Sequence, residues 1–370
     1  MSTTTTLHNK PVPALRRLWS MFGTGSWDRS TSTPKPKSDD DGRDSRSSAS
    51  LTQQLLLPAR SLKGNVSAVI SIVWAFTKND IFTFSLPVVI FGAALSLAKD
   101  ARTAPEPPTF NQVLSRLLGS CLFQFISLVL FDVDNQRDPT SVAEDRINKP
   151  WRPIPSGMIT SDQSRRLVLF LVPVIMALGY ALGIWNEALL VIIAAWVYNH
   201  LGGGDEPIVR EFVLGISYAL FQIASLRIAL GSGEYHAQTQ TDVVADVTSP
   251  SGYAWTAITG ALIATTIPMQ DMKDQEGDRL RPIRKTLPLF IGDTATRYYL
   301  AVTIPVWSVV GTVFWGTPGW YAVPIVVYGG YIAWRLLAKR NPVADEASWR
   351  NWSRWLMLVY ALPAVNALMQ

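Results

Sequence analysis

Residues 111–131 read NQVLSRLLGSCLFQFISLVLF, and Arg116 is the only charged residue among them. The apolar core of a bilayer is about 30 Å thick, and a helix crosses it with roughly 20 mostly apolar residues. This stretch therefore predicts a transmembrane helix. Eight further stretches of similar character lie before and after it. The nine expected spans lie near residues 80–98, 111–131, 167–184, 187–202, 211–230, 252–270, 298–315, 319–334 and 352–369.

The composition agrees with an all-α, polytopic membrane protein. The chain is 48% hydrophobic and 11% aromatic, and its mean hydropathy is +0.17. A net charge of +5 would also suit a nucleic-acid-binding protein, but such proteins gather their basic residues on water-exposed modules. Here the basic residues punctuate apolar runs, so we expect a lipid bilayer as the partner, no nucleic acid and no obligate protein partner. Cys121, the single cysteine, cannot form an intrachain disulfide.

The first 65 residues form a separate compositional region. They are rich in Ser, Thr, Asp, Lys and Arg and contain few large apolar side chains, so we expect a disordered tail. No cleavable secretory signal is visible near Met1. Residues 66–370 are predicted to form the membrane domain. Within it, the short apolar stretch 66–77 is expected to lie along the membrane surface or to extend the first span.

The distribution of Lys and Arg predicts how the spans are oriented. Basic residues are concentrated in the tail and in the loops after spans two, four, six and eight, whereas residues 231–251 carry none. Because loops rich in Lys and Arg stay in the cytosol, we expect a cytosolic N-terminus, a C-terminus on the far side and a location in the endoplasmic reticulum. Arg227 is left near the far end of span five, where snorkelling is the simpler interpretation.

Two acidic segments follow spans two and six and so are expected on the same cytosolic face. Residues 131–157 read FDVDNQRDPTSVAEDRINKPWRPIPSG, and residues 270–288 read QDMKDQEGDRLRPIRKTLP. In a helix Glu144, Asp145 and Asn148 would share one face. If the helix of span six continues, the three aspartates of the second segment would also share a face. These are Asp271, Asp274 and Asp278.

Carboxylates crowded in this way repel one another unless a cation lies between them. Short acidic side chains suit Mg²⁺, which shares its coordination shell with substrate phosphates. The interleaved basic residues would suit the remaining charge of a diphosphate. We therefore predict a site for a lipid with a diphosphate head, against the alternative that both segments are merely solvated loops. The basic candidates are Lys149, Arg152, Arg279, Arg281 and Lys285.

The paired segments resemble the UbiA superfamily of intramembrane prenyltransferases. The resemblance implies nine transmembrane helices around a central cavity, with metal bound at Asn-Asp-x-x-Asp-x-x-x-Asp and Asp-x-x-x-Asp motifs. It implies metal ligation by Asn135, Asp145, Asp274 and Asp278, with Asp271 nearby, and diphosphate contacts from Lys149, Arg152 and Lys285. With the neighbouring acidic and polar groups added, the expected Mg²⁺ ligands are Asn135, Asp138, Glu144, Asp145, Asp271, Asp274 and Asp278. The expected diphosphate-binding residues are Asn148, Lys149, Arg152, Arg279 and Lys285, and Asp145, Asp271 and Asp274 are expected to be essential for catalysis.

The first motif departs from the family pattern. Gln136 follows Asn135 where the pattern has Asp, and Ser141 stands at the middle Asp position when the motif is counted back from Asn148. Asp138 could replace the missing carboxylate if the loop folds back. This variant resembles the fungal branch of the superfamily, which includes membrane sesquiterpene cyclases of the bergamotene type.

Three classes of function fit nine spans to different degrees. A cyclase, which uses a double bond of the prenyl chain itself, is favoured by the variant motif, and farnesyl diphosphate is its expected substrate. An aromatic prenyltransferase, which needs a second substrate, is the alternative. A transporter without chemistry would not explain two acidic loops with a basic fringe.

Overall fold

The computed structural model describes residues 59–103, 108–234, 247–281 and 283–369. Within them the regular structure is helical, apart from one isolated β-bridge between Arg102 and Thr248. Helix α2, Ala59–Thr77, already begins inside the segment that we assigned to the tail. The remainder of the predicted disordered tail and residues 235–246 of the 231–251 loop lie outside the described residues.

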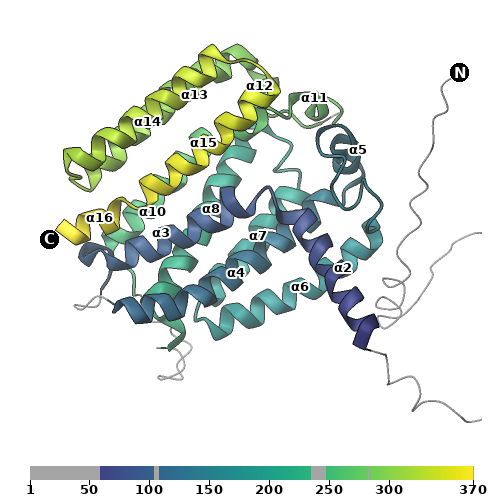
Figure 1. Cartoon of the computed structure of the whole chain (residues 1–370), viewed down its shortest axis with the longest axis horizontal. Helices are drawn as coiled ribbons and strands as arrows, with labels where there is room; N and C mark the ends of the chain where they lie inside the picture. The colour runs from purple at the N-terminus through teal and green to yellow at the C-terminus, as the bar shows by residue number, and fades with distance from the viewer. Residues whose placement is uncertain (1–58, 104–107, 235–246, 282, 370) are drawn as a thin grey trace, which may run out of the picture. The chain divides into compact units, whose positions relative to one another are not determined.

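Each of the nine expected spans overlaps a helix (Figure 1). The first begins as a π-helical turn, η1 (Ile81–Ser85), and continues as α3 (Leu86–Leu97). The last is divided between α15 (Pro342–Tyr360) and α16 (Leu362–Met369). The others are α4 (Phe110–Gln136), α6 (Ser161–Ala181), α7 (Trp185–His200), α8 (Pro207–Leu230), α10 (Pro250–Thr266), α13 (Asp293–Phe314) and α14 (Gly319–Ala338).

Five of these helices are long and apolar enough to cross a membrane: α4, α6, α8, α13 and α14. The number becomes six if the residues of α2 from Val66 onward and those of Ile81–Leu97 form one bent span. Helices α7 and α10 have 16 and 17 residues and so are short for a membrane-spanning helix. The prediction of a helical protein with several transmembrane segments is confirmed, whereas the count of nine is not.

Helix α8 is the central element, because it packs against α3, α4, α7 and α10 (Figure 1). Small residues allow the close approach. A Cβ atom on Gly92 of α3 would lie 2.5 Å from the Ser225 side chain of α8, and one on Gly215 of α8 would lie 2.7 Å from Ala264 of α10. Helices α13 and α14 run side by side and contact α15.

The two acidic segments fold into short helices at the ends of α4 and α10. The first forms α5 (Pro139–Asn148), which Asp138 caps by accepting a hydrogen bond from the backbone N–H of Thr140. The second does not continue the α-helix of span six, so the condition under which three aspartates would share one α-helical face is not met. Pro268 lacks the N–H that an α-helix needs, and the chain tightens into a 3₁₀-helix, η3 (Ile267–Met272), before a single turn, α11 (Gln275–Asp278).

Candidate active site

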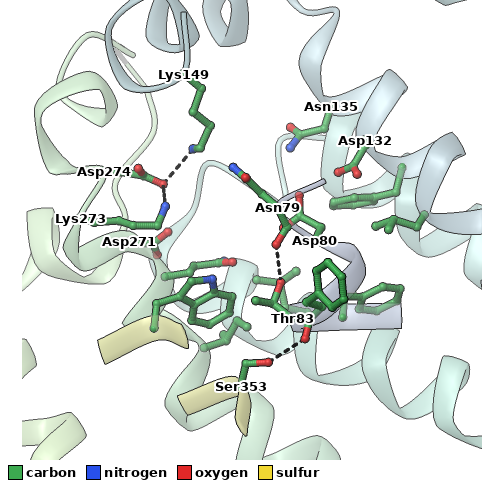
Figure 2. A pocket seen from close by; sticks show the side chains of 18 of the residues that line it. Asn79, Asp80, Thr83, Asp132, Asn135, Lys149, Asp271, Lys273, Asp274 and Ser353 are labelled. Carbon is green, nitrogen blue, oxygen red and sulfur yellow. Dashed lines mark hydrogen bonds and ion pairs between the residues drawn. The ribbon is translucent and has the colours of Figure 1, made fainter. Parts of the chain in front are cut away.

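A cavity of about 930 Å³ lies where these short helices meet the bundle. Residues of η1, α4, α5, α7, α8, η3, α11 and α15 line it. Charged side chains gather at the end near the two acidic segments (Figure 2). Figure 2 shows Lys149, Asp271, Lys273 and Asp274 on one side, and Asp132 and Asn135 on the other.

On the first side each carboxylate except one is paired with a cation. Asp271 accepts two hydrogen bonds from Arg210 of α8, at 2.6 and 2.8 Å. One carboxylate oxygen of Asp274 accepts from both Lys149 and Lys273, at 2.9 and 2.8 Å. The exception is Asp278, which is 1% exposed and whose two carboxylate oxygens have no hydrogen-bond partner.

The carboxylates of α5 are held in the same way. Asp145 is fully buried, and both of its oxygens accept from one nitrogen of Arg152, at 2.8 and 2.9 Å. Arg152 lines the cavity, whereas Asp145 lies behind it. Glu144 lines the cavity and contacts Arg281 and Arg284 at 3.4 and 3.3 Å. Asp145 is therefore placed to hold Arg152 rather than to face a ligand directly.

Asn148 joins the two acidic segments. Its side-chain nitrogen donates to the backbone carbonyl of Asp274 at 2.9 Å, and its side-chain oxygen accepts from the backbone N–H of Gly277 at 3.0 Å. The side chain still borders the cavity beside Lys149. We predicted that Asn148 and Lys149 both bind the diphosphate. The side-chain amide of Asn148, however, is hydrogen-bonded to the second segment on both its nitrogen and its oxygen.

The opposite wall comes from the end of α4. Asn135 lines the cavity, as does Asp132, one of whose buried oxygens has no hydrogen-bond partner. Asp138 does not line this cavity. It caps α5 and borders a second pocket of about 110 Å³ beside His200 and Asp205, so the expected replacement of the missing motif carboxylate is not seen here.

Three of the five basic candidates are also placed elsewhere. Arg279 and Lys285 are exposed and do not line the cavity, and Arg281 lines the second pocket instead. Arg284, one residue before Lys285, lines it instead. Sequence reasoning also passed over eight further charged residues of the wall, which are Lys78, Asp80, Asp132, Arg210, Lys273, Glu346, Arg350 and Arg354. Asp132 offered a usable signal, because it precedes Asn135 by three residues and so shares its helical face.

The surroundings shift the pKa values of two carboxyl groups of the second segment in opposite directions. Burial alone would raise the pKa of Asp274, but the ammonium groups of Lys149 and Lys273 hold it well below its usual range. Burial raises the pKa of Asp278 to about 7, although the Arg284 guanidinium opposes the shift. Asp274 is thus a fixed anion, whereas Asp278 gains or loses its proton near neutrality.

The donor set fits a magnesium ion that is shared with a phosphate group. Mg²⁺ is typically held by one or two carboxylates, water and substrate phosphate oxygens rather than by a cage of protein ligands. The described residues contain no cluster of three or more His, Cys, Asp or Glu side chains that could hold a metal by themselves. The unpartnered buried oxygens of Asp278 and Asp132 are free acceptors on opposite sides of the cavity. Asn135 and Asp274 complete an all-oxygen set of the kind that Mg²⁺ prefers.

The cavity becomes apolar and aromatic away from the charged end. Phe84 of η1 meets Tyr218 and Phe221 of α8 edge to face, with ring centroids 4.9 and 4.7 Å apart. Leu128 and Leu214 also line this part. A charged mouth joined to an apolar interior suits an amphiphile with an anionic head and a hydrocarbon chain.

Together the helices and this site define a polytopic membrane protein with a lipid-sized cavity that charged loops border at one end. Comparison with known proteins gives the family. Residues 85–357 match the model of the UbiA prenyltransferase family, and the chain belongs to that family. The predicted resemblance and the prediction of an integral membrane enzyme are thereby confirmed.

Two curated relatives are similar over most of the chain. Somaliensene A/B synthase of Streptomyces somaliensis is 28% identical over 300 residues, which cover 79% of this chain and 91% of that protein. Fumagillin beta-trans-bergamotene synthase of Aspergillus fumigatus is 27% identical over 291 residues, with the same coverage. A UbiA homolog from Archaeoglobus fulgidus, solved with GPP and Mg²⁺, has the same fold, with a TM-score of 0.55 and 13% identity over 79% of this chain and 99% of that one.

Proposed function

We propose that this protein is a Mg²⁺-dependent membrane terpene cyclase that converts farnesyl diphosphate to a sesquiterpene hydrocarbon and diphosphate. The observation that carries the proposal is the cavity itself, which joins a charged mouth to an interior lined by aromatic rings. The two relatives described above are terpene synthases of the UbiA type, which supports a cyclase over a transferase.

The cations of the mouth are arranged to receive a diphosphate. Lys149, Lys273, Arg152, Arg210 and Arg284 all line the cavity. All of them except Arg152 also lie beside a cavity-lining carboxylate that could instead face a metal. A diphosphate could accept hydrogen bonds from these groups without leaving a buried carboxylate unpaired, provided that Mg²⁺ takes the carboxylates. We propose that Mg²⁺ is held by one or two of the oxygen donors that line the cavity, together with diphosphate oxygens. These donors are Asn135, Asp132, Asp271, Asp274 and Asp278, with Glu144 beside them. Asp145 acts through Arg152.

The chemistry that follows needs only the prenyl chain. Bound Mg²⁺ neutralises charge on the diphosphate leaving group. The C–O bond breaks, the diphosphate leaves with the electron pair, and the lysine and arginine side chains stabilise its charge. A distal double bond of the folded chain attacks the allylic cation and forms a new C–C bond. Loss of one proton to the diphosphate then gives a hydrocarbon with the carbon count unchanged.

The aromatic interior would serve this sequence of cations in two ways. It excludes water, which would otherwise trap the cation as an alcohol. The faces of Phe84, Tyr218 and Phe221 can also stabilise a passing positive charge. Rings held edge to face by one another cannot turn freely, so the positions of their faces are fixed before the substrate binds.

We further propose the membrane arrangement that the sequence predicts. Nine spans would place both acidic segments and the N-terminus in the cytosol and the C-terminus on the lumenal side of the endoplasmic reticulum membrane. The bias of Lys and Arg toward the loops after spans two, four, six and eight supports this orientation. The substrate head would then bind at the cytosolic end of the cavity while its chain extends into the apolar interior between the helices.

The experiment uses membranes that contain the protein, farnesyl diphosphate and Mg²⁺ alone, with gas chromatography and mass spectrometry of the volatile products. We expect a sesquiterpene hydrocarbon, and none in the presence of EDTA. Asp274→Asn should lower turnover by about 100-fold or more. Asp162→Asn removes an exposed carboxylate of α6 that pairs only with neighbouring arginines, and should leave turnover unchanged.

Two results would contradict the proposal. Hydrocarbon formation that persists in EDTA would exclude the dependence on Mg²⁺. Farnesol alone, with prenylation of an added aromatic acid, would identify the protein as a prenyltransferase.

A further inference from the structure

One face of α8 lines the cavity from its mouth to its end. Arg210, Leu214, Ser217, Tyr218 and Phe221 all border it, and their spacing places them on one side of the helix. At 1.5 Å per residue, the distance along α8 from Arg210 to Phe221 is roughly 16 Å. Helix α8 would therefore run alongside a bound prenyl chain, starting at the diphosphate. The position of a residue along this face then corresponds to its depth in the cavity.

Phe221 is the last residue of α8 that lines the cavity, and it belongs to a layer of three rings. Phe84, Tyr218 and Phe221 meet edge to face, and all three line the cavity. The layer is held from behind, because the Gln124 side chain donates to the backbone carbonyl of Phe221 at 3.0 Å. Gln124 is fully buried and does not line the cavity.

About one helical turn beyond Phe221 the helices close on one another. Ser225 of α8 shares a hydrogen bond of 2.7 Å with Ser120 of α4, and on the other side it touches Gly92 of α3. Beside this contact, the Gln222 side chain bonds the Tyr360 hydroxyl at 2.6 Å and accepts from Thr259 at 2.8 Å. Phe221 thus lies between the cavity and a layer of buried side chains that hydrogen-bond one another.

We propose that the Phe84–Tyr218–Phe221 layer is the floor that determines which prenyl chain length the enzyme accepts. The inference rests on the proposed function for its substrate class. A chain whose head is fixed by the lysines and arginines meets the rings with its tail, and one that is an isoprene unit too long has no space. Removing the ring of Phe221 would lengthen the cavity only as far as Ser225, which is roughly 6 Å further along α8.

The test compares donors rather than products. Diphosphate release is measured with geranyl, farnesyl and geranylgeranyl diphosphate, because a cyclase and a transferase both release it. In Phe221→Ala we expect kcat/KM to shift toward the next longer donor by roughly tenfold or more, relative to the parent. Ser217→Phe adds a ring about one turn closer to the mouth and should shift the preference toward the next shorter donor by a similar factor.

Phe123→Ala is the matched control. Phe123 belongs to the same ring cluster, with its centroid 6.4 Å from that of Phe221, but it is fully buried and does not line the cavity. We expect its donor preference to equal that of the parent. If Phe221→Ala does not fold, Ser217→Phe decides the question.

Two results would contradict the proposal that the ring layer determines chain length. Ser217→Phe, or a folded Phe221→Ala, could keep the donor preference of the parent. Phe123→Ala could shift the donor preference as much as Phe221→Ala does. The products answer the separate question of function. If the protein prenylates an acceptor and its donor preference still shifts as described, the proposed cyclase function is refuted. The proposed role of the ring layer in selecting chain length is then retained.

Discussion

Asn148 and Gly277 contact each other across the two acidic segments, with the Gly277 backbone N–H donating to the Asn148 side-chain oxygen at 3.0 Å. A Cβ atom on Gly277 would lie 2.4 Å from the same amide, so no other residue fits there without displacing Asn148. Since Asn148 also bonds the carbonyl of Asp274, it fixes the second segment against α5. The spacing of the site's carboxylates thus depends on one neutral side chain.

Gly277→Ala and Asn148→Ala should therefore impair activity without removing a charge. Each lost hydrogen bond costs about 1 kcal/mol of stability, and a misplacement of about 1 Å can cost roughly 100-fold in turnover. We expect a small fall in melting temperature in detergent and a large fall in diphosphate release. Asn351→Ala is the control, because Asn351 also donates one and accepts one hydrogen bond, with Ala347 and Tyr328, away from the cavity. Equal losses of activity in the control would contradict a positioning role.

Asp145 and Arg152 should behave as one unit in a double-mutant cycle. Asp145 is buried behind Arg152, so removal of either partner leaves the other without its main contact. We expect Asp145→Ala and Arg152→Ala each to lower turnover strongly, and the double variant to be no less active than either single one. Effects that multiply would show that Asp145 acts independently, for example as a direct metal ligand.

Asp278 should make stability depend on pH when no metal is present. Burial raises its pKa from 3.8 to about 7, so the folded protein holds this proton more tightly than the unfolded chain does. The folded state therefore loses stability as pH rises from about 4 to about 7. We expect the melting temperature in EDTA to fall over this interval more steeply in the parent than in Asp278→Asn, which has no proton to lose. Parallel curves would show that Asp278 keeps an ordinary pKa.

The membrane orientation can be tested with reporters at the two ends of the chain. An odd number of spans places a reporter before Met1 and one after Gln370 on opposite sides. From the basic loops we expect the first in the cytosol and the second in the lumen. Both reporters on one side would require an even number of spans and would contradict the placement of the loops.

The positions of the helices were predictable because apolarity is a local property. Each expected span overlaps a helix. The prediction failed at two kinds of position, which are the end of span six and the side-chain directions in the acidic loops. Span six ends in a 3₁₀-helix because of Pro268, which a count of apolar residues does not detect. The acidic loops were found by composition, but a loop has no period from which the direction of each side chain can be read. A shift of one residue replaced the expected Lys285 with Arg284 at the cavity.

The sequence alone determined the membrane class, the family and the two charged segments, because apolar length and motif spacing are written along the chain. Only the tertiary structure decided which charges face the cavity and which hold one another. Lys149 and Asp274 are 125 residues apart and pair at 2.9 Å, while Asp138, inside the first segment, caps a helix instead. The end of the cavity depended equally on the tertiary structure, since Phe84 and Phe221 meet only when η1 packs near α8. Burial and pairing energies depend on distances in space, and these exist only once the helices have packed.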